Sequence, residues 1–346
     1  MAFRAGEELD RARLEPYLAG KLPGAGGALE LWQFGGGNAN LTYLVRYANG
    51  AEFVLRRPPH GPVAPSAHDM SREYRVLSRL YRVFPPAPRA FLLCEDAAII
   101  GAPFFVMERR HGIVVRRSVP PEFGGGSDPV ANRKLSEVLI DTLADFHAVD
   151  PAAVGLETLG KPEGFLGRQV QGWTERWERA KLDDVPAATE LARWLADTLP
   201  PSPPATLIHN DWRLDNMAVA ADDPGRCAAV YDWDMCTRGD PLADLGTLLS
   251  QWVEAGESLP PVSPMPSHEA GFMTRAQAID RYAKRSGRDV AHVEWYYVFG
   301  MFKIAVIVQQ IFIRWHRGQT KDERFALMGQ VASGLMSIAR DKSLAV

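Results

Sequence analysis

The first hundred residues carry short apolar runs separated by turn signals, a pattern that predicts antiparallel strands. Strand-like runs lie at residues 29–34, 41–47 and 52–56. The Asn49-Gly50 pair between the last two runs is a hairpin signal, because both residues tolerate positive φ. Residues 99–107 are expected to form two more strands around a turn, whereas apolar side chains at helical spacing predict a helix over 68–82.

Beyond residue 107 the apolar spacing becomes mainly helical. Helices are predicted over 130–148 and 165–198, and the short apolar runs 205–208 and 228–231 read as buried strands. The change of pattern predicts an α+β chain with two lobes. An antiparallel-sheet N-lobe is assigned to residues 1–107, and a mainly helical C-lobe to residues 108–346.

Local signals define two further helices. Residues 8–20 form an amphipathic pattern at the start of the chain. Thr274 and Gln277 have the spacing of a capping box, in which each side chain bonds to the backbone of the other residue. Gly287 is placed to end that helix, since glycine readily adopts the left-handed conformation found there.

Composition and charge narrow the class of protein. The chain has 346 residues, which suits two lobes, and its formal net charge of −3 argues against a nucleic-acid partner. Its three cysteines form no C-x-x-C pair, and its acidic N-terminus is unlike a signal peptide. Polar residues interrupt the apolar stretch 295–315, which predicts a buried helix rather than a membrane span. We therefore expect a cytoplasmic protein; the sequence does not define its oligomeric state.

The most informative segment runs from His209 to Asn216 and follows a predicted strand. Asp211 and Asn216 are five residues apart, and Asp232 comes directly after the next apolar run. This spacing matches phosphoryl transfer, in which one Asp accepts the hydroxyl proton while an Asn and a second Asp bind Mg²⁺. Mg²⁺ prefers such hard oxygen ligands. Asp211 is assigned as the catalytic base, and Asn216 and Asp232 as metal ligands.

Structural roles compete with this interpretation, because Asp and Asn often form turns and helix caps. His209 is expected to brace the loop by hydrogen bonds. Asp240 and Asp244 are expected to cap a helix and tie down the loop. Asp215 and Asp234 are expected to contact the metal ligands rather than the metal itself.

A glycine-rich hairpin is predicted to cover the phosphates of ATP. Gly36, Gly37 and Asn40 lie between two strand-like runs, with no helix directly after them and no Gly-Lys-Ser/Thr motif elsewhere. This order fits a kinase glycine loop better than a dinucleotide fold or a P-loop. Taken alone, the glycines would form a turn more often than a phosphate cradle.

A kinase lobe also needs a strand cation paired with a helix glutamate. Glu73 lies in the predicted helix, but Arg56 stands where lysine is expected. Arginine keeps the charge and can bind phosphate, although with a different geometry. The alternative is that Arg56 and Arg57 are solvated charges at a strand end.

Together these motifs resemble the aminoglycoside phosphotransferase and choline kinase superfamily, which has a protein-kinase-like two-lobe fold. The resemblance rests on His209-Asn-Asp211…Asn216, Asp232-Trp-Asp234, Gly239-Asp-Pro241…Asp244 and the small-lobe residues above. It implies Mg-ATP as cofactor, with the adenine bound by backbone groups at Met107, Glu108 and Arg109.

The chain departs from the superfamily pattern at two positions. Arg56 replaces the usual lysine, and Asn210 replaces the glycine usual between His and Asp. A closer likeness is to the phosphotransferase domain linked to acyl-CoA dehydrogenases and to its stand-alone bacterial relatives, in which arginine replaces that lysine. Three segments carry it: 53–59, 295–303 and 318–325.

Charge in the C-terminal helices bears on the acceptor. Residues 274–346 hold twelve Lys or Arg against six Asp or Glu, which favours an anionic acceptor over a cationic aminoglycoside. The closer resemblance suggests a hydroxyacyl-CoA, whose phosphates could meet Lys303, Arg314 or Arg324. Solvated helix faces would give the same excess of positive charge.

Three alternatives remain open at this stage. The aromatic cluster around Trp295 would suit a choline-like cation, although core packing is the commoner role of such a cluster. A nucleotide-binding module without catalysis is consistent with Arg56. A metal-dependent hydrolase would leave the glycine hairpin and Glu73 unexplained.

Overall fold

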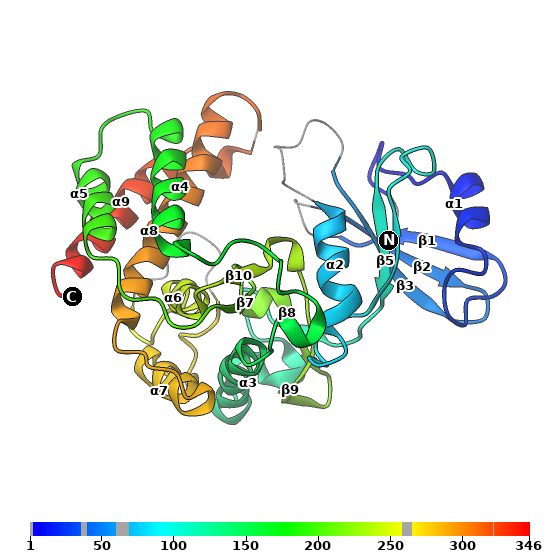
Figure 1. The fold of residues 1–346 in the computed structure, drawn as a ribbon, viewed down its shortest axis with the longest axis horizontal. Helices are drawn as coiled ribbons and strands as arrows, with labels where there is room; N and C mark the ends of the chain where they lie inside the picture. Colours follow the sequence, from blue (N-terminus) through cyan, green and yellow to red (C-terminus); the bar gives the residue numbers. More distant parts are fainter. Residues whose placement is uncertain (1–2, 36–39, 60–68, 258–264, 321) are drawn as a thin grey trace. The chain divides into compact units, whose positions relative to one another are not determined.

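The computed structural model describes the chain except for residues 1–2, 36–39, 60–68, 258–264 and 321 (Figure 1). The chain forms two compact units. The first comprises residues 1–112, 154–156 and 228–236, and the second comprises the rest. The first unit thus ends after Gly112 rather than after Met107. Arg110 explains part of this difference, because its guanidinium donates to the Pro85 carbonyl oxygen (3.0 Å).

The first unit is built on a five-stranded antiparallel sheet in the order β1-β2-β3-β5-β4. Its strands are β1 (Leu29–Gln33), β2 (Leu41–Tyr47), β3 (Glu52–Arg57), β4 (Ala90–Cys94) and β5 (Phe104–Glu108). Its helices are α1 (Arg11–Leu18) and α2 (Met70–Leu80). The predicted hairpin turn is confirmed: Gly50 has φ +87°, and its N–H donates to the Tyr47 carbonyl oxygen.

One prediction in this unit was wrong. Residues 99–107 contain a single strand, β5, because Gly101 closes a tight turn with φ +82° before it. β5 pairs with β3 on one side and with the edge strand β4 on the other, and β4 was not predicted from the sequence. Proline-rich chain surrounds β4, and the missing alternation of polar and apolar residues hid it.

Alternation along β3 sets the two faces of the sheet. Leu55 belongs to the core cluster with Tyr43 and Val106, on the face covered by α1. Arg56 therefore points to the opposite face, where α2 packs. The register of this strand places a charged side chain next to a helix that carries Glu73.

The second unit is mainly helical, as predicted. Its helices are α3 (Pro129–His147), α4 (Phe165–Ala180), α5 (Pro186–Asp197), α6 (Pro241–Ser250), α7 (Arg275–Ser286), α8 (Val293–His316) and α9 (Met328–Ser343). The segment 165–198 is thus two helices, since Pro186 starts α5. Both signals at the ends of α7 are confirmed, because Thr274 and Gln277 form a capping box and Gly287 is left-handed.

Short strands complete the second unit. β7 (Thr206–Ile208) pairs with β10 (Thr237–Gly239), and β6 (Ile113–Val114), β8 (Met217–Ala220) and β9 (Asp223–Val230) form a second small sheet. The last residues of β9 are grouped with the first unit.

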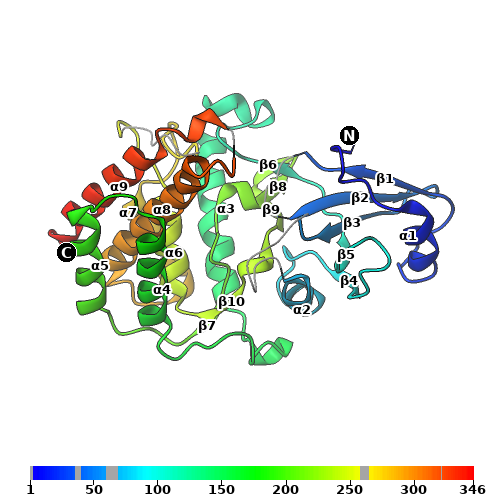
Figure 2. The same ribbon diagram turned by 90° about the horizontal axis from the view of Figure 1, so that it is seen from above.

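Helix α8 is the centre of the helical layer and contacts α4, α6 and α9 (Figure 2). Gly246 permits the close crossing with α6, because a Cβ there would lie 2.3 Å from the Tyr296 carbonyl oxygen. Among the described residues, α8 alone is long and apolar enough to cross a membrane, but 67% of its apolar window is buried. It is therefore packed as a core helix, as predicted.

Candidate functional site

A buried ion triad lies on the α2 face of the first unit. Arg56 donates from Nη1 to Glu73 Oε1 (2.5 Å) and from Nη2 to Asp232 Oδ1 (2.9 Å). The side chains of Arg56 and Glu73 are 9% and 0% exposed, whereas that of Asp232 is 34% exposed. Arg56 is thus the partner of the helix glutamate. Arg57 is buried on the other face and donates to the Ile100 carbonyl oxygen (2.8 Å), so neither arginine is a solvated strand-end charge.

The triad carries an excess of negative charge. Burial and the nearby carboxylates of Asp232 and Asp234 raise the pKa of Glu73 to about 8, although Arg56 opposes the shift. Burial alone would lower the pKa of Arg56, but the charges of Glu73 and Asp232 raise it. One cation and three carboxyl groups therefore share a small volume, and added positive charge is favourable there.

Asp232 has a backbone conformation that is unusual for a residue with a side chain. It follows β9 in the left-handed region, with φ 65° and ψ 59°. Such conformations cost free energy and tend to persist at functional sites. Behind it, Asp234 accepts a long hydrogen bond from the buried amide of Asn40 (3.5 Å). Gly36 and Gly37 lie outside the described residues.

The segment predicted to hold adenine ends β5. Met107 pairs with Val54, and the Glu108 side chain accepts the Arg89 N–H and forms an ion pair with Arg110. Arg109 forms an ion pair with Glu52. These contacts fix the side chains of Glu108 and Arg109, so any nucleotide contact here would use backbone groups. That role stays a prediction.

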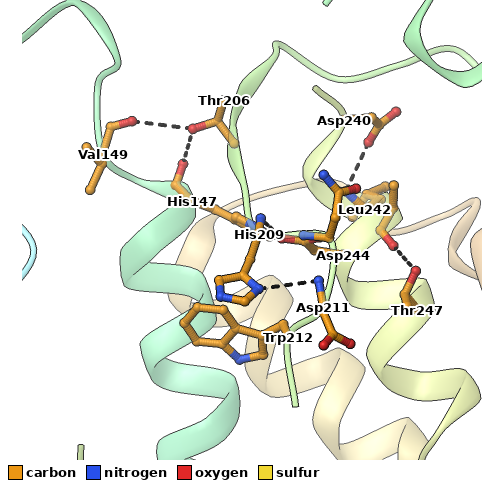
Figure 3. A network of polar contacts seen from close by, with 12 residues as sticks. His147, Val149, Thr206, His209, Asp211, Trp212, Asp240, Leu242, Asp244 and Thr247 are labelled. Carbon is orange, nitrogen blue, oxygen red and sulfur yellow. Dashed lines mark hydrogen bonds and ion pairs between the residues drawn. The ribbon is translucent and has the colours of Figure 1, made fainter. Parts of the chain in front are cut away.

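In the second unit, Asp244 holds the loop that follows β7 (Figure 3). Its carboxylate accepts the N–H groups of His209 (2.6 Å) and Asn210 (2.7 Å). Asp240 caps α6 by accepting the Leu242 N–H (2.9 Å). The structural roles predicted for Asp240 and Asp244 are confirmed.

A buried histidine that was not predicted from the sequence supports Asp244. His147, at the end of α3, places Nε2 3.3 Å from Asp244 Oδ2, and the Tyr282 hydroxyl lies 2.7 Å from its Nδ1. Burial lowers the pKa of His147, so a neutral ring donates to Asp244 and accepts from Tyr282. Burial would raise the pKa of Asp244, but the hydrogen bonds from His147 and from the His209 N–H lower it. The sequence offers no local signal, since His147 lies 97 residues before Asp244.

Asp211 and Asn216 meet at the end of this loop. The Asn216 side-chain amide donates to Asp211 Oδ2 (2.7 Å) and to the Asp211 carbonyl oxygen (2.9 Å). His209 Nδ1 accepts the Asp211 N–H (3.3 Å), so the bracing role predicted for His209 is confirmed. Because the Asn216 nitrogen is engaged with Asp211, the amide oxygen is the atom that remains for a cation.

Asn210 has φ 70°, which explains the departure from the usual glycine. Glycine enters the left-handed region without strain, and asparagine tolerates it better than most residues do. The substitution therefore preserves the loop conformation.

Three other predictions concern the C-terminal helices. The aromatic residues Trp295, Tyr296 and Phe299 are at most 3% exposed, so they pack in the core. Lys303 is buried and donates to Thr247 Oγ1 (3.1 Å), which removes it from any solvent-facing phosphate site. Arg324 is exposed and pairs with Asp322 (2.6 Å).

The predicted residues therefore fall into two groups. Arg56, Glu73 and Asp232 belong to the first unit, and Asp211 and Asn216 to the second. Within the described ranges, no three His, Cys, Asp or Glu side chains are grouped as a ready metal site. Mg²⁺ commonly takes one or two carboxylates and completes its shell with phosphate oxygens and water, so these oxygen donors fit Mg²⁺ delivered with a nucleotide. That the three predicted residues share one metal stays a prediction.

Sequence relatives include acyl-CoA dehydrogenase family members. Member 11 of Gallus gallus is 38% identical over 247 residues, and member 10 of Mus musculus is 32% identical over 334 residues. These alignments cover 70% and 95% of this chain but only 31% and 30% of the relatives. The chain spans about a third of the length of these curated relatives.

Solved structures show the same architecture. A protein assigned as an aminoglycoside phosphotransferase from Ralstonia eutropha has a TM-score of 0.84 at 28% identity, covering 98% of this chain and 99% of its own. A choline kinase from Cryptosporidium parvum has a TM-score of 0.65 at 11% identity, covering 97% and 96%, which shows the fold alone. Residues 30–281 match the phosphotransferase enzyme family, known as APH. The chain belongs to this family, and its fold is that of the kinase-like phosphotransferases.

Proposed function

We propose that this protein transfers the γ-phosphate of ATP, bound with Mg²⁺, to a hydroxyl group of a small anionic molecule. In this reaction the hydroxyl oxygen forms a bond to the γ-phosphorus, the bond between phosphorus and the ADP oxygen breaks, and the hydroxyl proton passes to the Asp211 carboxylate. The observation that carries the proposal is the fixed Asp211–Asn216 pair, with 2.7 Å between Nδ2 and Oδ2.

The described residues support distinct roles. Asp244 clamps the loop through two backbone N–H groups, which holds Asp211 ready to accept a proton. Asn216 and Asp232 would bind Mg²⁺ through oxygen, and Arg56 would contact ATP phosphates while Glu73 holds it in place. Bound Mg-ATP supplies the phosphoryl group and the cation that offsets its charge.

A hydroxyacyl-CoA is the leading candidate for the acceptor. Two observations support it: the sequence relatives are acyl-CoA dehydrogenase family members, and basic residues outnumber acidic ones over 274–346. A nucleotide-binding module without catalysis is the second candidate, because Arg56 occupies the place of the usual lysine.

Transfer from [γ-³²P]ATP to a panel of acceptors tests the proposal. The panel contains hydroxyacyl-CoA thioesters, aminoglycosides and choline, with a sample lacking any acceptor to measure hydrolysis. We expect labelled product, dependent on Mg²⁺, from a hydroxyacyl-CoA. Nucleotide binding without any labelled acceptor would favour the binding module, and phosphate release without an acceptor would indicate a hydrolase.

A further inference from the structure

Four arginines from two helices line one surface pocket of the second unit. Arg176 and Arg179 come from the last turns of α4, and Arg314 and Arg317 from the end of α8. The pocket has a volume of about 370 Å³, and its other lining residues are Ala180, Gln310 and Ile313. No carboxylate lines it among the described residues.

The four guanidinium groups are not neutralised by ion pairs with described carboxylates. Loss of hydration lowers the pKa of Arg176, repulsion from Arg179 lowers it further, and Glu175 offsets only part of this shift. Positive charge at helix C-termini is favourable, which explains how the free protein tolerates the cluster. Four exposed guanidiniums around one pocket nevertheless suit an anion with several phosphate oxygens, which arginine binds through paired hydrogen bonds.

Cation–ring contacts lead from this pocket into the core of the same unit. The Arg176 guanidinium lies over the Trp173 ring, 4.4 Å from its centroid, and the Lys303 ammonium lies 5.6 Å from the same centroid. The charges of Asp244 and Asp211 in turn act on Lys303. The pocket and Asp211 therefore belong to the same unit, as an acceptor that contacts both requires.

We propose that this four-arginine pocket binds the phosphate groups of the acceptor, and that the acceptor is a coenzyme A thioester. This inference rests on the proposed function, because the ligand is an acceptor only if phosphate is transferred to it. Binding of the ligand to the pocket requires no catalysis. Coenzyme A suits the pocket because its pyrophosphate and 3′-phosphate lie at the opposite end from the acyl group, so the reacting hydroxyl can stay remote from the arginines.

Calorimetric titration of coenzyme A into the full chain tests the pocket. A saturating non-hydrolysable ATP analogue with Mg²⁺ is present throughout, so that coenzyme A cannot report on the ATP site. The variant Arg176→Gln/Arg314→Gln should bind coenzyme A at least about 10-fold more weakly, because each lost charged hydrogen bond matters at a phosphate. Arg193→Gln, which removes an exposed guanidinium of α5 outside the pocket, should bind like the wild type.

Two further ligands identify the source of the phosphates. Dephospho-coenzyme A should bind more weakly than coenzyme A, and tripolyphosphate should compete only partially. Unchanged coenzyme A affinity in the double variant, or no binding by the wild type, would overturn the proposal. Tight tripolyphosphate binding that depends on the arginines, with coenzyme A unaffected, would overturn the coenzyme A assignment. Coenzyme A binding lost in the double variant, in a protein that phosphorylates nothing, would support the pocket while refuting the kinase reaction.

Discussion

Arg56 and Glu73 form a buried ion pair, with 2.5 Å between Nη1 and Oε1, although one comes from a strand and the other from a helix. The pair shows that an arginine can occupy the place of the strand lysine and keep a helix glutamate as its partner. The second amino group of Arg56 donates to Asp232, so the same guanidinium also contacts the predicted metal ligand.

Removing Arg56 should both destabilise the protein and weaken its use of ATP. Arg56→Ala removes the cation that opposes the raised pKa of Glu73, so this carboxyl stays protonated, and the loss of its hydrogen bond to Arg56 should cost about 1–3 kcal/mol. Chemical denaturation measures this loss, and steady-state kinetics should show a higher KM for ATP. The double variant Arg56→Ala/Glu73→Ala should recover part of the stability, since the buried Glu73 carboxyl is removed together with its partner. Equal stability of Arg56→Ala and wild type would show that the pair contributes nothing.

The left-handed backbone at Asn210 predicts which substitutions the loop after β7 tolerates. Asn210→Gly should retain stability and activity, because glycine adopts φ 70° without strain. Asn210→Val should lose about 1–2 kcal/mol and much of the activity, since a β-branched side chain resists this conformation. Thermal unfolding with parallel activity measurements checks both. Comparable behaviour of the valine and glycine variants would mean that the loop does not need this conformation.

Stability should depend on pH through His147. Burial lowers its pKa in the folded state below the ordinary value of 6.5, so the unfolded state binds the proton more tightly. Above pH 6.5, His147 contributes fully to the free energy of unfolding. As the pH falls below 6.5 this contribution is lost, at up to about 1.4 kcal/mol per pH unit. Urea unfolding between pH 7 and 5 should show this slope.

His147→Asn should flatten that slope, and His316→Gln, at the exposed end of α8, should leave it unchanged. The lowered pKa of Asp244 acts in the same direction but only below its ordinary value of 3.8, so the two contributions separate. A slope that persists in His147→Asn would assign the effect to another group.

Asp232→Ala should abolish Mg²⁺-dependent turnover while the protein stays folded. Its side chain is one-third exposed and Glu73 still pairs with Arg56, so the triad survives in part. Binding of a fluorescent ATP analogue should lose its enhancement by Mg²⁺. Asp222→Ala removes an exposed carboxylate that pairs with surface Arg226, and it serves as the control. Full Mg²⁺-dependent activity in Asp232→Ala would exclude Asp232 as a ligand.

Local signals predicted much of the fold. The Asn49-Gly50 hairpin, the capping box at Thr274 and the buried character of α8 each depend on neighbouring residues, and all three are confirmed. Strand β4 was missed because its residues do not alternate between polar and apolar. Its pairing with β5 is a tertiary contact that overrides weak local preference.

The candidate site was predictable to the same extent. Loop motifs pointed to Asp211, Asn216 and Asp244, and the structure brings Asp211 and Asn216 into contact and places Asp244 on the same loop. The catalytic role of Asp211 and the metal-binding role of Asn216 stay predictions. His147 could not be found this way, since its contact with Asp244 joins helices far apart in sequence. The arginine pocket could not be predicted from the sequence either, because its residues come from α4 and α8, which are brought together only in the folded unit.

The activity of the Asp211→Asn variant is the most direct test of the proposed reaction. Phosphate transfer from Mg-ATP to the best acceptor of the panel should fall about 100- to 10,000-fold in Asp211→Asn, the range expected for loss of a general base. Binding of the ATP analogue should stay unchanged, because the asparagine preserves the size of the side chain. Transfer at the wild-type rate by Asp211→Asn would contradict the account.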